Sequence, residues 1–215
     1  MRAVLVASGD PLPADAGWLD EADLVMAVDG GAAWLQSIGR RPDVLVGDLD
    51  SIEPAVVDQL ERGGVEVERH PVEKDSSDCE LALAHAVRRG ADRIVVLGAI
   101  GGERLDHELA NVLLLVAPTQ PGGLDLRIVR GATCLRVVRS GSTLTIEARL
   151  GSLVSLLPLG GDAEGVTTSG LRYALHDEPL HMGSTRGLSN VVAAQPASVR
   201  LRQGTLLVIE TSPEE

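Results

Sequence analysis

Residues 24–51, LVMAVDGGAAWLQSIGRRPDVLVGDLDS, contain the pattern that is most informative about the fold. It holds two short apolar runs, Leu24–Val28 and Val44–Val46, and a segment at 31–38 between them that suits an amphipathic helix. Short β-branched runs that alternate with helical segments are typical of parallel strands joined by helices. Residues 24–51 therefore predict a strand-helix-strand unit.

The same alternation extends from residue 3 to about residue 116. It predicts further strands at Ala3–Ala7, Val65–Glu68 and Arg93–Leu97, and helices at Gly31–Ile38, Glu53–Arg62, Asp78–Arg89 and His107–Val116. Ser77 followed by Glu80 predicts a capping box at the start of the third helix, and Asp106 is expected to cap the fourth. We expect an α/β N-terminal domain with a mostly parallel sheet.

The pattern changes after Thr119–Leu124, a segment that contains Pro-Gly-Gly. Beyond it no helix of ordinary length fits, and turns separate short strands. These are predicted at Leu126–Val129, Cys134–Val138, Thr143–Ile146, Leu153–Leu157, Gly165–Thr168, Val191–Gln195, Val199–Arg202 and Leu206–Ile209. Such spacing favours an antiparallel sandwich or barrel. We predict an α/β domain at 1–120 and an all-β sandwich domain at 121–215.

Composition excludes several classes of partner. The chain of 215 residues carries a formal net charge of −12, which opposes broad contact with nucleic acid. Its apolar runs are too short for a signal peptide or a membrane span. Cys79 and Cys134 lie far apart and form no CxxC motif, so a reduced structural role is expected for each. We expect a cytoplasmic protein that binds neither nucleic acid nor membrane.

Polar clusters follow three of the predicted strands of the first domain. They are Asp29-Gly30-Gly31, Gly47-Asp48-Leu49-Asp50-Ser51 and Gly98-Ala99-Ile100-Gly101-Gly102. In open α/β sheets the ligand crevice lies outside the carboxyl ends of the strands. We therefore expect the three clusters to converge on one site.

The acidic residues of these clusters predict a magnesium site. Asp48 and Asp50 are two apart in an extended stretch, and Asp75 and Asp78 bracket a helix start. Each aspartate alone suits a turn or a helix cap as well. Two carboxylates about 4 Å apart repel by ~4 kcal/mol near a surface, so several together need a cation. All-oxygen ligation favours Mg²⁺, which takes one or two carboxylates together with waters and phosphates.

Other phosphate and hydrolase motifs are missing from the sequence. The only lysine, Lys74, is followed by Asp75, so no Walker A loop exists, and no GxGxxG or GxSxG occurs. The run His107-Glu108-Leu109-Ala110-Asn111 resembles a zinc-protease HExxH but ends in asparagine, which leaves no second imidazole. The aspartate clusters remain the best candidates for binding phosphate, through metal.

The ordered motifs together resemble thiamine pyrophosphokinase. The motifs are Asp29-Gly30-Gly31-Ala32, Pro42-Asp43 followed by Gly47-Asp48-Leu49-Asp50-Ser51, Glu73-Lys74-Asp75-Ser76-Ser77-Asp78, Gly98 to Asn111 and Leu188-Ser189-Asn190. The resemblance runs from about residue 25 to the end. It implies an α/β domain followed by a β-sandwich, ATP and Mg²⁺ at the site, thiamine as acceptor, and a homodimer with the thiamine site between subunits.

The resemblance also assigns roles. It implies Asp48, Asp50 and Asp78 as magnesium ligands with Asp75 beside them, Arg104 and Asp106 as nucleotide and phosphate contacts, and Ser189 and Asn190 as contacts of the thiamine pyrimidine. The remaining nucleotide-binding positions that it implies are Asp29, Gly30, Gly31, Lys74, Ser77, Gly101, Gly102, His107 and Asn111.

This chain departs from the family pattern in three places. Glu103 stands between Gly-Gly and Arg104, where many members have none, and Ser77 replaces the usual threonine but keeps a hydroxyl. No aromatic residue follows Tyr173, so aliphatic packing would replace the ring that some relatives stack on the pyrimidine.

The implied reaction converts ATP and thiamine to thiamine diphosphate and AMP. Magnesium would bridge phosphate oxygens, and Arg104, with Lys74 as a further candidate, would offset developing charge. Either Asp75 or Asp106 could accept the hydroxyl proton. A pyrophosphokinase for a hydroxymethyl-pterin or similar alcohol is the alternative enzyme. A non-catalytic thiamine or nucleotide sensor is the alternative from another class, although it would not need the metal ligands.

Overall fold

The computed structural model describes residues 1–50, 52–117 and 122–213. The chain forms two compact units, Met1–Gly131 and Ala132–Glu215. The boundary predicted after residue 120, and the first three residues of the segment predicted at Thr119–Leu124, lie outside the described residues, as does Ser51. The prediction assigned the strand at Leu126–Val129 to the second domain. In the structure this strand pairs in parallel with the strand at Arg93–Leu97 and belongs to the first unit.

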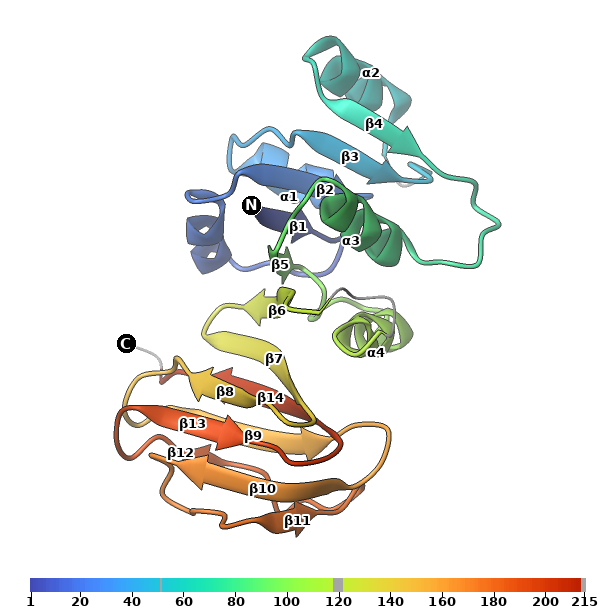
Figure 1. Ribbon diagram of the computed structural model, residues 1–215. Coiled ribbons are helices and arrows are strands. Elements are labelled where there is room, and N and C mark those ends of the chain that lie inside the picture. Colours follow the sequence, from blue (N-terminus) through green and yellow to red (C-terminus); the bar gives the residue numbers. More distant parts are fainter. Residues whose placement is uncertain (51, 118–121, 214–215) are drawn as a thin grey trace. The chain divides into compact units, whose positions relative to one another are not determined.

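The first unit is built on a parallel sheet (Figure 1). Its strands are β1 (Arg2–Val6), β2 (Leu24–Val28), β3 (Val44–Gly47), β4 (Glu66–Arg69), β5 (Arg93–Leu97) and β6 (Asp125–Arg130). Their order is β6-β5-β1-β2-β3-β4, so the strand order reverses at β1. All residues of β2 and β3 are buried, as expected when both faces of a parallel sheet are covered.

Four α-helices cover this sheet. They are α1 (Gly31–Ser37), α2 (Pro54–Arg62), α3 (Asp78–Arg88) and α4 (Leu105–Leu114). Right-handed crossovers place α1 and α2 on one face and α3 and α4 on the other, and Figure 1 shows α1 and α3 on opposite sides of β2. A 3-10 helix, η1 (Pro13–Leu19), which the sequence pattern did not predict, joins β1 to β2.

Two helix starts were predicted from capping residues, with different outcomes. The Ser77 hydroxyl accepts a hydrogen bond from the Glu80 backbone N–H at 3.2 Å, which is the serine half of the predicted capping box. The prediction that Asp106 caps α4 is wrong. Arg104 occupies the N-cap position, and Asp106 lies in the first turn, where the Arg104 guanidinium binds its carboxylate.

The second unit is all β and antiparallel. One sheet has the order β12-β9-β14-β7 and the other β11-β10-β13-β8. The strands are β7 (Thr133–Arg139), β8 (Thr143–Ile146), β9 (Leu153–Pro158), β10 (Ala163–Ser169), β11 (Glu178–Leu180), β12 (Asn190–Val191), β13 (Ala197–Arg200) and β14 (Thr205–Thr211). Alternate side chains of both sheets, among them Val166, Leu156 and Val208, meet in one apolar core. The predicted sandwich is confirmed.

The strands of this unit differ from the prediction in two places. The strand expected at Val191–Gln195 stops at Val191, because the N–H groups of Ala193 and Ala194 both donate to the Gly170 carbonyl and bend the chain. Strand β11 was not predicted, since its three residues, Glu178–Leu180, offer too short a pattern.

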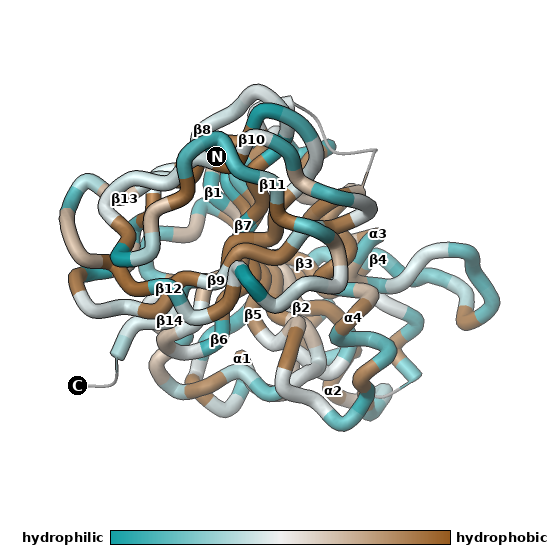
Figure 2. Tube along the Cα trace, turned by 90° about the horizontal axis from the view of Figure 1, so that it is seen from below, coloured by the Kyte–Doolittle hydropathy of each residue, from teal (hydrophilic) through white to brown (hydrophobic). Residues whose placement is uncertain are grey.

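Hydrophobic residues concentrate in the strands, and the loop that joins β4 to α3 is mostly hydrophilic (Figure 2). Among the described residues, no helix has both the length and the apolar character needed to cross a membrane.

A buried ion pair joins β7 to β14. The Arg136 guanidinium binds the Glu210 carboxylate, and both side chains are 5% exposed. The other Glu210 oxygen accepts 2.8 Å hydrogen bonds from the backbone N–H groups of Glu147 and Ala148. The carboxylate thus satisfies one guanidinium and two backbone donors at once.

We predict that Glu210→Ala lowers the free energy of unfolding by about 3–5 kcal/mol, because it leaves two amides without their acceptor and removes the buried partner of the Arg136 guanidinium. That guanidinium keeps its bonds to Glu147 and the Thr145 carbonyl. Urea unfolding followed by circular dichroism measures the change. Arg202→Ala, which breaks the exposed pair with Asp177, is the control and should cost less than about 1 kcal/mol. Equal losses in the two variants would contradict this assignment.

Candidate functional site

A cleft of about 520 Å³ opens at the carboxyl ends of the strands of the first unit. The loops after β1, β2, β3 and β5 line it together with the first turns of α3 and α4. Its polar and glycine lining comprises Ser8, Gly9, Asp29, Gly30, Asp48, Asp50, Ser77, Asp78, Gly98, Gly102, Glu103, Arg104, His107, Glu108 and Asn111. The convergence predicted for the three clusters is therefore observed, at the edge where the strand order reverses.

The turn after β2 brings Asp29 close to the turn after β3. Asp29 has a φ of 45°, and a Cβ atom on Gly47 would lie 1.7 Å from the Asp29 Oδ1. Only glycine at position 47 allows this approach. The Leu49 N–H donates to the same oxygen at 3.5 Å, with Leu49 itself at a φ of 63°.

Lys74 lies between two of the predicted magnesium ligands. Its Nζ is 2.7 Å from Asp78 Oδ1 and 3.8 Å from Asp48 Oδ2, and the three side chains are 14–17% exposed. The contact with Asp78 is an ion pair without hydrogen-bond alignment. Burial lowers the pKa of Lys74, but contact with Asp78 and the nearby carboxylates outweigh it and the pKa is raised.

The carboxylates still outnumber this cation. Burial, followed by repulsion from Asp78, raises the pKa of Asp29 from 3.8 to about 7. The pKa of Asp50 is raised by its interaction with Asp48, whose Oδ1 accepts a hydrogen bond from the Asp50 backbone N–H at 3.1 Å. The site has an excess of negative charge that a further cation would relieve.

The site suits a divalent cation that is bound partly by phosphate oxygens, and not one that is coordinated by protein side chains alone. Among the described residues, no three His, Cys, Asp or Glu side chains are placed to hold a metal ion by themselves. Mg²⁺ usually takes one or two carboxylates and completes its octahedron with waters and phosphate oxygens. The partly buried pair Asp48 and Asp78 offers such a partial set of hard oxygen ligands.

Three other residues predicted for this site, Ser77, Asp75 and Gly31, have different positions relative to the cleft. Ser77 lines the cleft while its hydroxyl caps α3. Asp75 is exposed and is not among the described residues that line the cleft. Gly31 serves packing, because a Cβ atom there would lie 1.9 Å from the Val6 carbonyl oxygen.

The loop after β5 and the start of α4 form the opposite wall. Arg104 lines the cleft, and its Nε and Nη2 atoms bind the two Asp106 oxygens at 3.0 and 2.6 Å. Hydrogen bonding by Arg104 lowers the pKa of Asp106 to about 2. His107 and Asn111 line the cleft, as does the backbone of Gly102.

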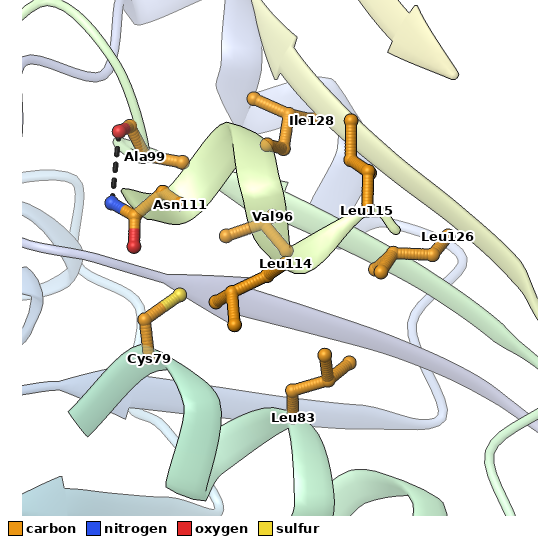
Figure 3. A pocket seen from close by; sticks show the side chains of 9 residues that line it. All are labelled: Cys79, Leu83, Val96, Ala99, Asn111, Leu114, Leu115, Leu126 and Ile128. Atoms are coloured by element: carbon orange, nitrogen blue, oxygen red, sulfur yellow. Dashed lines mark hydrogen bonds between the residues drawn. The ribbon is translucent and has the colours of Figure 1, made fainter. Parts of the chain in front are cut away.

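A small apolar cavity of about 10 Å³ lies beside this wall (Figure 3). Cys79 and Asn111 border both the cavity and the cleft. Burial raises the pKa of the Cys79 thiol to about 12, so the thiol stays protonated at neutral pH and serves packing.

Sequence reasoning missed the contribution of the first strand. Ser8 and Gly9 line the cleft, and the Gly9 N–H donates to the Gly98 carbonyl at 2.8 Å. A Cβ atom on Gly9 would lie 2.3 Å from that oxygen. The signal was present, because Ser8-Gly9-Asp10 directly follows a predicted strand, as the other polar clusters do.

Family models match both units of the chain. The model described as "Thiamin pyrophosphokinase, catalytic domain" matches residues 17–124, and "Thiamin pyrophosphokinase, vitamin B1 binding domain" matches residues 142–206. The chain belongs to the thiamin pyrophosphokinase family. The first match contains the cleft residues from Val28 to Asn111 but not Ser8 and Gly9, and the second covers most of the β-sandwich.

Named relatives agree over the whole length. Thiamine pyrophosphokinase of Bacillus subtilis (strain 168) is 26% identical over 99% of this chain and 100% of its own. Its crystal structure superposes with a TM-score of 0.88 at 27% identity and covers all of both chains. That of thiamin pyrophosphokinase from Geobacillus thermodenitrificans gives 0.84 at 30% identity, covering 100% of this chain and 99% of that one.

Within the thiamin pyrophosphokinase fold, Ser189 and Asn190 belong to the second unit. The Asn190 side chain is buried, and its Oδ1 and Nδ2 atoms bind the backbone N–H and carbonyl of Tyr173 at 3.0 and 2.7 Å. Ser189 is exposed at a φ of 57°. The asparagine amide thus fixes the backbone of the unit, so Ser189 is the more accessible of the two for contact with a substrate.

We predict that Asp29→Asn makes stability less dependent on pH. With a folded pKa of about 7 against 3.8, the folded state keeps a proton that the unfolded chain has already released. Stability is therefore lost as pH rises from about 4 to 7. Asparagine removes this loss, so at pH 8 in EDTA the variant should melt about 2–4 °C higher, after allowance for solvent screening.

Thermal unfolding of both proteins at pH 5 and pH 8 measures the effect. The difference between the two melting temperatures should be clearly smaller at pH 5 than at pH 8, because only about a third of the loss between the unfolded pKa of 3.8 and the folded pKa of about 7 has occurred at pH 5. An equal difference at both pH values would contradict the assignment of this pKa.

Proposed function

We propose that this protein is a thiamine diphosphokinase that transfers pyrophosphate from ATP to the hydroxyl of thiamine, giving thiamine diphosphate and AMP. The observation that carries the proposal is the cleft where Asp29, Asp48 and Asp78 meet beside Lys74, within the region matched by the family's catalytic model. The names of the relatives and the vitamin B1 binding match at 142–206 support thiamine as the acceptor.

We propose Asp48 and Asp78 as the protein ligands of Mg²⁺, and Asp50 as a third ligand that would approach the ion when the metal-nucleotide complex binds. Bound there, magnesium would neutralise phosphate charge and align the β-phosphorus for in-line attack. The Asp48 and Asp78 side chains are only 15% and 17% exposed and both contact Lys74, and the raised pKa of Asp29 supports the need for more positive charge. Nucleotide contacts are proposed for Gly30, Gly102, His107 and Asn111, which line the cleft.

The proton of the thiamine hydroxyl needs an acceptor. The low pKa of Asp106 and its two bonds to Arg104 make Asp106 a weak base while that pair holds. We therefore favour Asp75, an exposed carboxylate that follows Lys74 in the sequence and would have to approach the hydroxyl from outside the cleft lining. Arg104 can act on phosphate when substrate oxygens replace the Asp106 carboxylate, and Lys74 supplies charge from inside the site.

The test is AMP release from ATP and Mg²⁺ with thiamine, with a hydroxymethyl-pterin, or with no acceptor. We expect AMP with thiamine alone. Asp48→Asn should reduce this rate by about 10³-fold, since a lost metal ligand costs several kcal/mol of transition-state stabilisation, while stability in EDTA is nearly unchanged. Asp58→Asn, on the outer surface of α2, is the matched control.

Each other outcome rejects part of the proposal. AMP formed only with the pterin would identify a different acceptor, AMP without acceptor would indicate a hydrolase, and no AMP at all would favour a sensor. A fully active Asp48→Asn variant would refute the magnesium assignment.

We also propose that the protein is cytoplasmic and forms a homodimer with its thiamine site at the subunit interface. An exposed row of leucines on α4 supports self-association, because Leu105, Leu109 and Leu113 are 66%, 56% and 55% exposed and recur every four residues. One copy of this face can pair antiparallel with a second copy, which buries both rows.

Light scattering after gel filtration should give twice the 22.5 kDa of one chain. Leu109→Glu places charge in the centre of the row and should produce monomers, whereas Leu150→Glu, at an exposed leucine of the second unit, should not. A monomeric parent protein would refute the dimer, and a dimeric Leu109→Glu variant would refute its assignment to α4.

A further inference from the structure

Helix α4 holds the loop after β5 through two side chains on one face. Glu108 Oε1 accepts a hydrogen bond from the Gly101 N–H at 2.9 Å, and Asn111 Nδ2 donates to the Ala99 carbonyl at 2.9 Å. The two residues are three apart, so they project from the same side of the helix. Figure 3 shows Asn111 reaching Ala99 across the edge of the small cavity.

Gly101 is also confined from its other side. A Cβ atom there would lie 2.3 Å from Arg130 Nε, at the end of β6, and the Gly101 φ is 91°. Arg130 is fixed in turn by Asp10, whose carbonyl and Oδ2 accept from Nε and Nη2 at 3.2 and 2.8 Å. Gly101 in the loop after β5 therefore lies between Arg130, which Asp10 holds in place, and Glu108 of α4.

This loop forms a wall of the cleft. Gly98, Ala99 and Gly102 line it, and Gly98 joins the loop to Gly9 of the first strand's loop. Glycine N–H groups that line a cleft can bind phosphate only when the backbone is held in place. The Glu108 side-chain oxygen supplies the acceptor for the Gly101 N–H, and this hydrogen bond holds the loop to α4.

We propose that Glu108 is a positioning residue that sets the affinity for the triphosphate by holding the Gly98–Gly102 loop through the Gly101 N–H. The inference rests on the proposed function, because it takes the cleft to bind ATP. Glu108 acts through the loop, and the role requires its oxygen as an acceptor and not its charge. Glutamine should therefore replace it, and alanine should not.

The test compares Glu108→Ala and Glu108→Gln with Glu53→Ala, a change at an exposed glutamate before α2. In Glu108→Ala the KM for ATP, and the Kd for a non-reacting ATP analogue measured by calorimetry, should rise about five- to tenfold, as expected when one hydrogen bond that holds the loop is lost. The KM for thiamine should stay within about twofold. Glu108→Gln and Glu53→Ala should resemble the parent in all three constants.

Hydrogen exchange supplies a readout independent of turnover. The Gly101 amide should exchange faster in Glu108→Ala than in the parent, and Glu108→Gln should restore its protection. An unchanged affinity for the analogue in Glu108→Ala would overturn the proposal. So would a Glu108→Gln variant as impaired as Glu108→Ala, since this would indicate a role for the charge itself.

A failure of the proposed function would be seen separately. A parent protein that releases no AMP with thiamine would reject the reaction, while the analogue affinity and the exchange of Gly101 would still test the loop.

Discussion

Crowding of carboxylates at one end of a buried parallel sheet is the constraint on which the site depends. Asp29, Asp48 and Asp78 meet where the strands end, and Lys74 is the cation between the last two. Both faces of the sheet are covered, so the strand ends are where polar groups can gather without disrupting the core. Burial there makes each negative charge costly, and the raised pKa of Asp29 reports that cost.

Close backbone packing makes this crowding possible. Gly47 permits the approach of Asp29, and Gly9 and Gly98 bring the loops after β1 and β5 into direct hydrogen bonding. Side chains at these positions would collide with backbone or carboxylate atoms. The glycines next to the strand ends therefore shape the cleft as much as the acidic residues provide its charge.

Much of the fold could be predicted because its pattern is local. The runs at Leu24–Val28 and Arg93–Leu97 became strands with the predicted bounds, since four or five successive buried apolar residues between polar turns leave few alternatives. The placement of β6 could not be predicted in this way. Its sequence suits either kind of sheet, and only pairing with β5, distant in sequence, decides between them.

In the candidate site, too, some features follow from the local sequence pattern and others depend on the three-dimensional structure. The convergence of the clusters followed from their places after parallel strands. The positions of long side chains did not, because ion pairs such as Arg104 with Asp106 depend on distances that spacing does not fix. Asn190 was predicted as a substrate contact from resemblance, and its use by the Tyr173 backbone is visible only in three dimensions.

Binding of Mn²⁺ in place of Mg²⁺, followed by electron paramagnetic resonance in the presence of a non-reacting ATP analogue, tests most directly whether the carboxylate cluster holds a metal-nucleotide complex. Asp78→Asn should weaken Mn²⁺ binding by at least about tenfold. Loss of a residue that only hydrogen-bonds to a metal ligand typically costs about this much affinity, and loss of the ligand itself should cost at least as much. Equal Mn²⁺ affinity in Asp78→Asn and the parent protein would contradict the account.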